Sequence, residues 1–413
     1  MIQKSQSYKI NFFLTSLLLF TTIVLFTSST SNLYMASMVF LVISAAVGFM
    51  SSGKYKGFLF DKQNRIYVYW HISFFAFFLM HYSFVHWDDF SLMRALRIWL
   101  PPLIAFVWLS KVKSDDLLEF FGKCCVIASV PIVVMIMMST GLSMVSGGER
   151  LGSEDFNLDG NTVAVHMLFL IFFSLILYKM KKQWRVFILI MMAIMVMFIF
   201  ISGCRRAIIG LVLLVISYFL SFGGGKHQMK STFKIFLVIA VISYLLINIE
   251  IFYDVAGYRM EKIFINLGLM SGSKNFDSYD YSAEIRSQMV PIAFLMFMAN
   301  PINGNGYAFF ITHSGLNIST QSYSTHNNYL EILVNYGMVG FVLYYSIIFY
   351  ILYGLFKYRK QNWLNSFLLS FLLIHLLVIE PTTVNFCNYS VFYILYYILF
   401  RVVKTSKSNC QIA

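Results

Sequence analysis

Apolar segments long enough to cross a bilayer recur along this chain, and one long polar segment interrupts them. A spanning helix needs roughly 20 mainly apolar residues. Only 12% of the residues here are charged, whereas a soluble domain has about 25%. From 253 to 328 the apolar pattern stops and the composition becomes polar. The chain is therefore predicted to be an all-α integral membrane protein that works on the side where this segment lies.

Twelve membrane-spanning helices are predicted from the apolar segments. The fourth is interrupted by Pro101 and Pro102, which a span tolerates when neighbouring groups satisfy the freed carbonyls. The predicted organisation is spans 1–9 at 1–252, a large helical outer loop at 253–328, and spans 10–12 with a tail at 329–413. The spans are 10–27, 33–50, 66–84, 95–110, 120–139, 161–179, 184–202, 207–223, 233–252, 337–356, 363–380 and 387–403.

The distribution of charge predicts the orientation of the chain. With the N-terminus inside, the inner segments carry 22 Lys and Arg and 4 Asp and Glu, and the outer segments carry 9 and 14. The positive-inside rule requires an excess of Lys and Arg on the cytoplasmic side. Both termini are thus predicted to be cytoplasmic, with the loop outside. The net charge of +13 indicates topology and not a surface that binds nucleic acid.

The large outer loop is predicted to be a helical cap on the outer membrane face. Segments 257–270 and 281–300 have mixed apolar and polar helical patterns, and the second is expected to be kinked or divided at Pro291. Segments 272–280 and 300–307 have the composition of turns. The apolar sides of such helices face the bilayer or the helix bundle.

The run THNNYLEILVNYGMVG, which closes the loop, contains the candidate general base. A neutral histidine is suited to accept a proton near pH 7, so His326 is preferred and His313 is the alternative. Asn328 is predicted to be a helix N-cap, with Glu331 completing a capping box. The competing interpretation is that these residues only cap the helix.

Other residues of this run share a helical face or favour close packing. Asn327, Glu331 and Asn335 are spaced at i, i+4 and i+8, which places them on one face. Gly337 and Gly340 are expected to let a neighbouring helix approach closely.

Arginine accounts for seven of the nine outer basic residues. The planar guanidinium group of arginine presents several N–H donors whose geometry suits phosphate oxygens. Arg205 and Arg206 lie in a very short outer turn, against the positive-inside rule. Snorkelling to the lipid headgroups is the competing explanation. The other arginines on this side are Arg94, Arg97, Arg150, Arg259 and Arg286.

Several polar residues within the apolar segments are predicted to be structural. Cys204 is expected to be a buried thiol, and a disulfide with Cys387 is the alternative. The loops lack a P-loop and an Asp-x-Asp pair, which argues against ATP-driven chemistry and a metal-bound nucleotide-sugar donor.

Four histidines lie within predicted spans, and we expect them to form hydrogen bonds inside the bundle and not to relay protons. They are His71, His81, His166 and His375.

Four segments together resemble the superfamily of O-antigen polymerases and O-antigen ligases. HNNYLEILVNYGMVG is similar to its His-Asn signature, and SGCRRAIIGL to its Ser-Arg-x-x-x-x-Gly run, with Arg205 at the arginine position and Cys204 where serine is usual. ERLGSEDFNLDGNTVA maps Arg150 and Asn161. AEIRSQMVPIAFLMFMANPINGNGYAFF maps Arg286 and the glycines of a Pro-x-x-Gly-x-Gly turn.

The resemblance implies a GT-C-like membrane glycosyltransferase of the bacterial inner membrane that uses no metal or other cofactor. The donor would be a glycan on undecaprenyl diphosphate, and the acceptor a second lipid-linked repeat unit. His326, Arg205 and Arg286 would be catalytic. The partners are the lipid-linked donor and acceptor, the bilayer and a chain-length regulator protein. Substrate binding is assigned to Arg97, Arg150, Asn161, Arg206, Arg259, Asn327 and Glu331.

Three other functions stay open at this point. An O-antigen ligase would move the finished glycan onto lipid A core. A lipid-linked oligosaccharide flippase would show an internal repeat and charged residues at mid-membrane, and neither is found. A scaffold without activity is the third. Polymerase is preferred because the aromatic and methionine content and the unusual loop suit a unit-specific acceptor.

Overall fold

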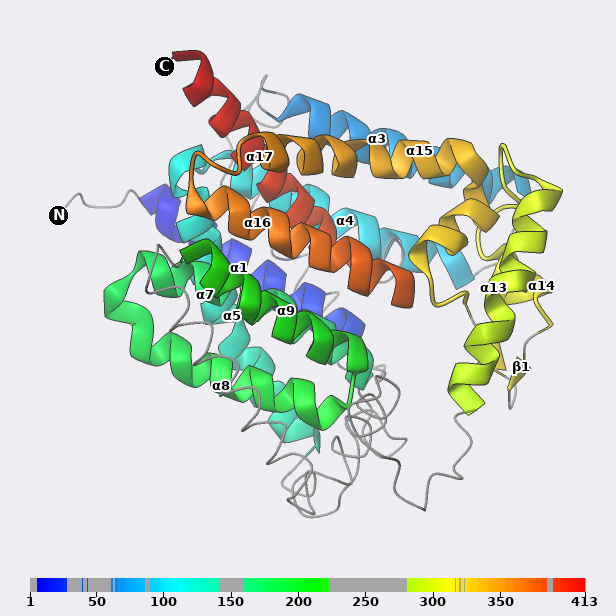
Figure 1. The fold of residues 1–413 in the computed structure, drawn as a ribbon, viewed down its shortest axis with the longest axis horizontal. Coiled ribbons are helices and arrows are strands. Elements are labelled where there is room, and N and C mark those ends of the chain that lie inside the picture. Colours follow the sequence, from blue (N-terminus) through cyan, green and yellow to red (C-terminus); the bar gives the residue numbers. More distant parts are fainter. Residues whose placement is uncertain are drawn as a thin grey trace. The chain divides into compact units, whose positions relative to one another are not determined.

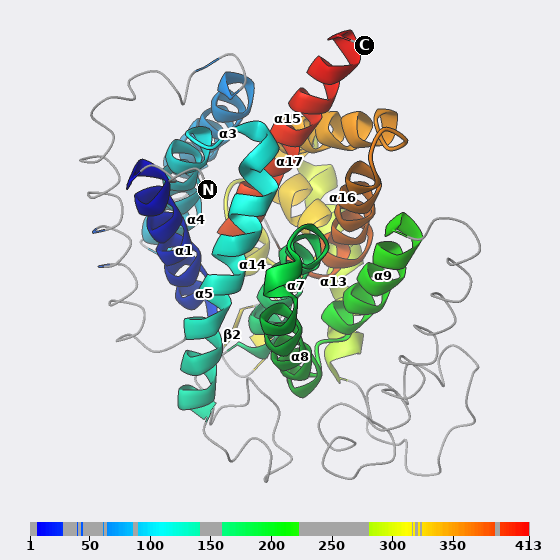
Figure 2. The same ribbon diagram turned by 90° about the vertical axis from the view of Figure 1, so that its left-hand side faces the viewer.

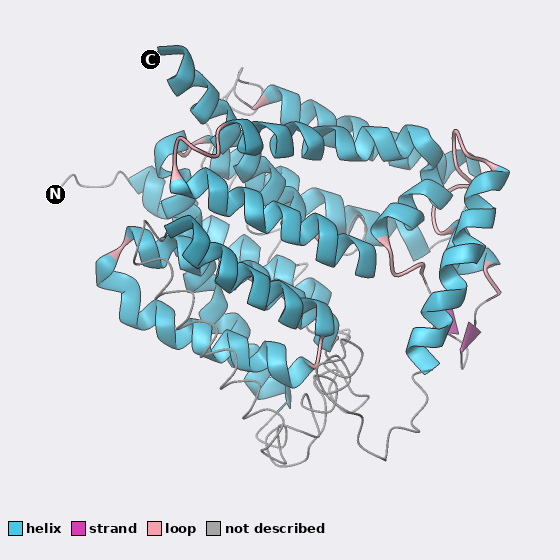
Figure 3. Ribbon diagram, in the orientation of Figure 1, coloured by secondary structure: helices cyan, strands magenta, loops and turns pink. Residues whose placement is uncertain are grey.

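Helices make up nearly all of the structure, a computed structural model of the chain (Figure 3). Two strands of two residues each, β1 (Asn317–Ile318) and β2 (Gln321–Ser322), form an antiparallel pair. The described residues form two compact units, and each is presented by itself. The structure describes residues 6–27, 39, 43, 61, 64–85, 90–140, 159–222, 281–315, 317–318, 321–322, 324–384 and 389–412.

The first unit is a bundle built around a nearly fully buried helix, α7. Among the residues described in this unit, six α-helices form the bundle: α1 (Gln6–Thr27), α5 (Leu117–Thr140), α7 (Gly160–Met180), α8 (Arg185–Ser202), α9 (Arg205–Phe222) and α16 (Trp363–Ile374). α7 packs against α1, α5, α8 and α9, and α16 packs against α9 (Figures 1 and 2). Phe172 stacks on Phe371 with ring centroids 3.7 Å apart. Lys181 and Lys123 both bind the carboxylate of Glu119, which joins α7 to α5.

The second unit is built around a long helix, α15 (Asn328–Lys357). α15 packs against α3 (Arg65–Val85), α13 (Tyr281–Ala299) and α17 (Ser390–Ile412). The unit also holds α4 (Phe90–Ser110) as far as Phe106, the short α14 (Phe309–His313), a π-helix (His375–Ile379) and a 3₁₀ turn (Glu380–Thr382). Its interior is aromatic: Trp99, for example, lies 4.7 Å from the ring of Tyr393 and 5.0 Å from that of His71.

Five described helices are long and apolar enough to cross a membrane, fewer than the twelve spans predicted. These are Ser114–Met138, Gly160–Met180, Lys182–Ser202, Asn328–Lys357 and Trp363–Thr382. Helices also form at the predicted spans 10–27, 66–84, 95–110, 207–223 and 387–403. Spans 33–50 and 233–252 and the loop helix 257–270 lie outside the described residues, apart from Val39 and Ile43. The count of twelve and the GT-C-like architecture therefore stay predictions.

The described part of the outer loop contains the second predicted helix. α13 runs through Pro291 as one helix, so it is not divided there, and the alternative of a kink at Pro291 stays a prediction. Met289 and Ala293 of α13 pack against Phe310 of α14 and Val334 of α15. This apolar contact explains why α13 stays in place on α15 although its opposite face, including Leu295, is exposed.

α15 is broken near its start, and a loop fills the break. Gly337 has φ 61° and ψ −163°, so the helix is interrupted between a short first part and the long remainder. Such a break frees carbonyls before it and N–H groups after it. The loop 301–306 satisfies them, through hydrogen bonds from Asn305 N to Val334 O (2.9 Å), Gly306 N to Asn335 O (2.9 Å), Met338 N to Pro301 O (2.8 Å) and Val339 N to Ile302 O (3.1 Å).

This interlock explains Gly337 and Gly304 and corrects one prediction. A Cβ on Gly337 would lie 2.3 Å from the carbonyl oxygen of Ile302, so the close neighbour is a loop and not a helix. The helix begins at Asn328, within one residue of the predicted start, and the interlock satisfies the groups that the break at Gly337 frees, so the helix extends ahead of the predicted span 337–356. The first part of α15 thereby presents the His326 turn.

Candidate functional site

His326 lies at the apex of a tight turn just before α15. Its φ is +50°, and among the described residues other than glycine only Ala308 shares this left-handed conformation. A left-handed φ is uncommon for such residues, although histidine tolerates it better than most. The side chain is half-buried. Strained backbone of this kind is found at functional sites when the surrounding structure holds it in place.

Hydrogen bonds on both sides of His326 hold this conformation. The Thr325 hydroxyl donates to the Asn327 carbonyl at 2.8 Å and accepts from the Asn327 N–H at 3.2 Å. The Thr325 N–H donates to Oε2 of Glu331 at 2.9 Å. Oε1 of Glu331 accepts from Nδ2 of Asn335 at 3.2 Å, which confirms the shared face. Glu331 is 2% exposed, and both its oxygens are used inside the protein.

The helix cap differs from the prediction by one residue. The N-cap is Asn327, whose side-chain oxygen accepts from the Leu330 N–H at 3.2 Å, and not Asn328. Glu331 binds the N–H of Thr325 rather than that of the N-cap. The physical reason is that the Asn328 side chain is fully buried and binds other groups, so it is not available to cap.

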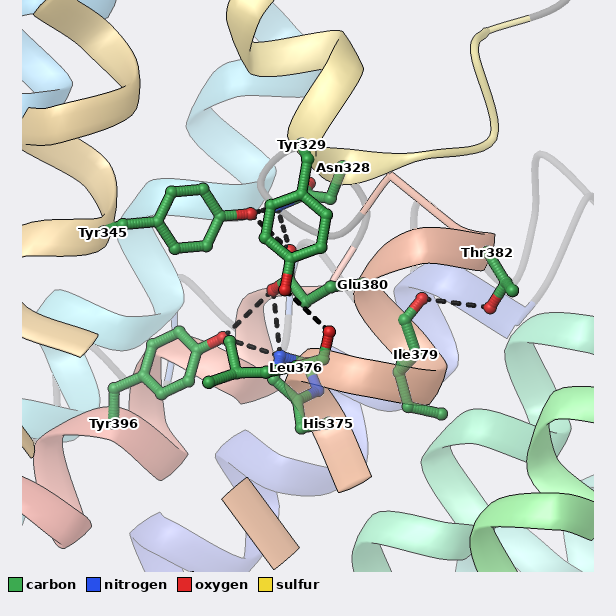
Figure 4. Close-up of polar contacts among 9 residues, drawn as sticks. All are labelled: Asn328, Tyr329, Tyr345, His375, Leu376, Ile379, Glu380, Thr382 and Tyr396. Atoms are coloured by element: carbon green, nitrogen blue, oxygen red, sulfur yellow. Dashed lines mark hydrogen bonds and ion pairs between the residues drawn. The ribbon is translucent and has the colours of Figure 1, made fainter. Parts of the chain in front are cut away.

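Asn328 belongs to a buried polar network centred on Glu380 (Figure 4). Nδ2 of Asn328 donates to Oε2 of the Glu380 carboxylate, and the Tyr345 hydroxyl donates to the same oxygen at 2.7 Å. On the other oxygen, Oε1, His375 Nε2 lies at 3.0 Å and the Tyr396 hydroxyl at 3.3 Å. The network joins α15, the π-helix and α17, and π-helical segments are frequent at functional sites.

Arg205 and Arg206 occupy the first turn of α9 in the first unit. The preceding turn is as short as predicted: α8 ends at left-handed Gly203, and Cys204 follows as a buried, free thiol. Both arginine side chains are half-buried. Positive charge is disfavoured at a helix N-terminus because it faces the positive end of the helix dipole. Helix stability therefore gives no reason for two arginines at this point.

The other predicted site residues are distributed over both units. Asn161 is the second residue of α7, and its N–H donates to the N-cap Asp159 at 3.1 Å. Arg97 lies on α4 and Arg286 on α13, with side chains that are not described. Arg150 and Arg259 lie outside the described residues. The structure thus brings Asn327 and Glu331 together beside His326, and the convergence of the arginines stays a prediction.

All four histidines of the apolar segments were predicted to be hydrogen-bonded within the protein, and the structure confirms this for three of them. His71 contacts the Trp99 carbonyl at 3.3 Å, His166 the Thr162 carbonyl at 2.9 Å, and His375 the Glu380 carboxylate. His81 packs between the rings of Phe77 and Tyr336. Within the described part of the chain, no three His, Cys, Asp or Glu side chains are grouped so that they could hold a metal ion.

The apolar helices and a family match together define the class of this protein, a multi-pass membrane protein. Residues 192–345 match the model of a family described as O-antigen ligase. This match confirms the resemblance predicted from the motifs, and we assign these residues to the superfamily of O-antigen ligases and polymerases. Members are membrane enzymes of the glycosyltransferase type, which implies lipid-linked saccharide substrates. No curated protein matches the chain.

The matched segment contains most of the candidate site. It includes both arginines of the α9 turn, the α13 arginine, the interlock and the His326 turn, and it ends at residue 345 within α15. Arg97, Arg150 and Asn161 precede it. The Glu380 carboxylate follows it, and the sequence pattern predicted no role for this residue. The only signal for Glu380 was an isolated acidic residue at the end of an apolar segment.

Proposed function

We propose that this protein is an O-antigen-type polysaccharide polymerase. It would transfer a growing glycan from polyprenyl diphosphate to a second lipid-linked repeat unit on the outer side of the bacterial inner membrane, without metal. The observation that carries this proposal is the His326 turn, a left-handed histidine clamped at the start of α15 within the segment that matches the O-antigen ligase family. A preorganised base of this kind suits proton removal from an acceptor hydroxyl.

The proposed reaction is a single displacement at the anomeric carbon of the donor. The bond between this carbon and the diphosphate oxygen breaks, and a bond to the acceptor oxygen forms. His326 takes the hydroxyl proton, and the diphosphate leaves with its charge neutralised by Arg205 and Arg286, together with Arg150 or Arg206. Asn161, Arg97, Arg259 and Asn327 would bind the saccharides. Both Glu331 oxygens already accept hydrogen bonds, from the Thr325 N–H and from Nδ2 of Asn335. We therefore propose that Glu331 positions His326 and does not bind substrate.

Replacing Arg205 with alanine is expected to lower glycan transfer by about 10²–10³-fold, because a positioned charge at the leaving group is lost. Arg205→Lys keeps the charge but not the fork of donors, so an intermediate rate is expected. Transfer is measured as the initial rate of product lengthening by purified protein in liposomes with a lipid-linked oligosaccharide. Arg185 is a matched control, because it also begins a helix of this unit and its guanidinium group binds the carbonyl oxygen and the ring of Tyr178. Equal rates for Arg205→Ala and Arg185→Ala would refute the role of Arg205.

Polymerase and ligase are separated by the lipopolysaccharide of a deletion strain on a gel. Loss of a polymerase leaves a single repeat unit on the core, whereas loss of a ligase leaves the core bare. We expect the single unit, restored to long chains by the wild-type gene. The liposome assay also separates an enzyme from a flippase, which would move the oligosaccharide without lengthening it. A chain-length regulator partner stays a prediction.

A further inference from the structure

The Glu380 carboxylate is buried without a lysine or arginine partner in the described structure. It is 0% exposed, and among the described residues its only salt-bridge partner is His375. Removing a carboxylate from water is costly unless hydrogen bonds replace the lost hydration. A carboxylate in this position therefore requires a specific set of donors around it.

The number of donors around Glu380 matches the number of hydrogen bonds that a carboxylate group accepts. Such a group accepts at about four positions, two on each oxygen. Oε1 faces His375 and Tyr396, and Oε2 faces Asn328 and Tyr345 (Figure 4). Nδ1 of His375 is buried and has no hydrogen-bond partner within the described structure, so Nε2 is the nitrogen that faces the carboxylate. A buried carboxylate whose two oxygens are both occupied in this way favours one arrangement of the segments that supply its donors.

The network reaches the His326 turn through Asn328. Asn328 is the first residue of α15 and directly follows the N-cap Asn327. On the other side of His326, the carboxylate of Glu331 holds the N–H of Thr325. The turn is thus fixed at one end by Glu331 and at the other by Glu380, which is 52 residues away from Asn328 in the sequence.

We propose that Glu380 is a positioning residue that fixes the His326 turn through its hydrogen bond with Asn328. The proposal rests on the proposed function for its effect on glycan transfer, but not for its effect on the turn. Glu380→Gln keeps the shape of the side chain and loses acceptor positions. One of its two polar atoms becomes a donor, so the four existing donors cannot all be accommodated.

Exchanging the donor and the acceptor between positions 328 and 380 tests the hydrogen bond between these two side chains. In the double variant Asn328→Asp/Glu380→Gln, the amide at 380 donates to a carboxylate at 328. A carboxylate in the first turn of α15 is also favoured by the helix dipole. Glu380→Gln alone is expected to lower the transfer rate about 10-fold, as for other residues that orient a reacting group. The double variant is expected to recover to within about threefold of wild type, because the two sites are directly coupled.

The chemical reactivity of His326 gives a readout that does not depend on transfer. Diethyl pyrocarbonate modifies accessible imidazoles, and mass spectrometry reports the rate at each histidine. In Glu380→Gln the rate at His326 is expected to change by more than about twofold as the turn loosens, and to return toward the wild-type rate in the double variant. The exposed His313 is the internal reference and should keep its rate.

Each result has a defined meaning. An unchanged His326 rate in Glu380→Gln would overturn the positioning role, and so would a double variant that restores neither readout. If wild-type protein lengthens no glycan but the His326 rate follows the swap, the proposed function fails and the positioning role stands. If Glu380→Gln does not accumulate in the membrane, Tyr345→Phe carries the same test, because it removes one of the four donors.

Tyr329→Phe is the matched control for simple loss of a hydrogen bond. The Tyr329 hydroxyl donates to the Leu376 carbonyl at 2.6 Å, so it joins α15 to the π-helix through a backbone acceptor and not through the Glu380 carboxylate. Its transfer rate and His326 reactivity are expected to stay near wild type. Changes as large as those of Glu380→Gln would show that any loosened contact here has this effect, which would refute a specific role for Glu380.

Discussion

Replacing His326 with alanine is expected to lower glycan transfer by about 10²–10⁴-fold, the usual contribution of a positioned general base. The turn should survive the change, because the hydrogen bonds that hold it are formed by Thr325, Asn327 and Glu331. Long polysaccharide should therefore disappear from cells while the amount of protein in the membrane, measured by immunoblot, stays normal. Initial rates in liposomes give the magnitude.

His313→Ala is the matched control for this prediction. His313 lies in the same unit, 13 positions earlier, but it is exposed at the end of α14 and contacts the Phe309 carbonyl at 3.1 Å. We expect wild-type chain length from this variant. If His313→Ala abolished transfer and His326→Ala did not, the assignment of the base would pass to His313, the alternative left open by the sequence.

Replacing Gly304 with alanine is expected to destabilise the protein by more than about 3 kcal/mol, because a left-handed conformation and overpacking both oppose the new methyl group. Gly304 has φ +75°, and a Cβ there would lie 2.4 Å from the Tyr336 nitrogen and 2.5 Å from the Asn335 carbonyl oxygen. These are backbone atoms of the interlock, so no side-chain rotation relieves the clash. Little monodisperse protein should be recovered in detergent, and the thermal midpoint of what remains should fall.

Gly315→Ala separates the clash from the backbone conformation. Gly315 has φ +67°, but no atom lies within 4 Å of a Cβ built on it. Only the cost of the left-handed backbone conformation applies here, so the free energy of unfolding is expected to fall by about 1 kcal/mol. Similar thermal midpoints for the two variants would show that the interlock at Gly304 is not as tight as the structure indicates.

Sequence patterns predicted the membrane class and the positions of individual helices well. Helix α7 begins and ends within about one residue of its predicted span, because the length of an apolar run sets the length of a span directly. The start of α15 was predicted within one residue, and its membrane span was predicted to begin at 337, the residue where the helix is broken. The apolar pattern begins there, whereas the preceding turn of helix depends on the loop 301–306.

The candidate site was predicted in its residue types but not in its connections. His326, Asn327 and Glu331 stand out in the sequence because a histidine followed by amides at a helix start is unusual in an apolar chain. Their true partners were not predictable. Asn328 binds Glu380 rather than capping the helix, since the cap is determined by which of two adjacent amides is buried.

The sequence by itself therefore determined that this is a helical membrane protein and to which superfamily residues 192–345 belong, because hydropathy and motif order are local properties of the chain. Only the tertiary structure decided how the His326 turn is held. Its clamp, the loop that fills the break at Gly337 and the buried carboxylate of Glu380 depend on hydrogen bonds between segments distant in the sequence, and these form only when folding excludes water from both partners.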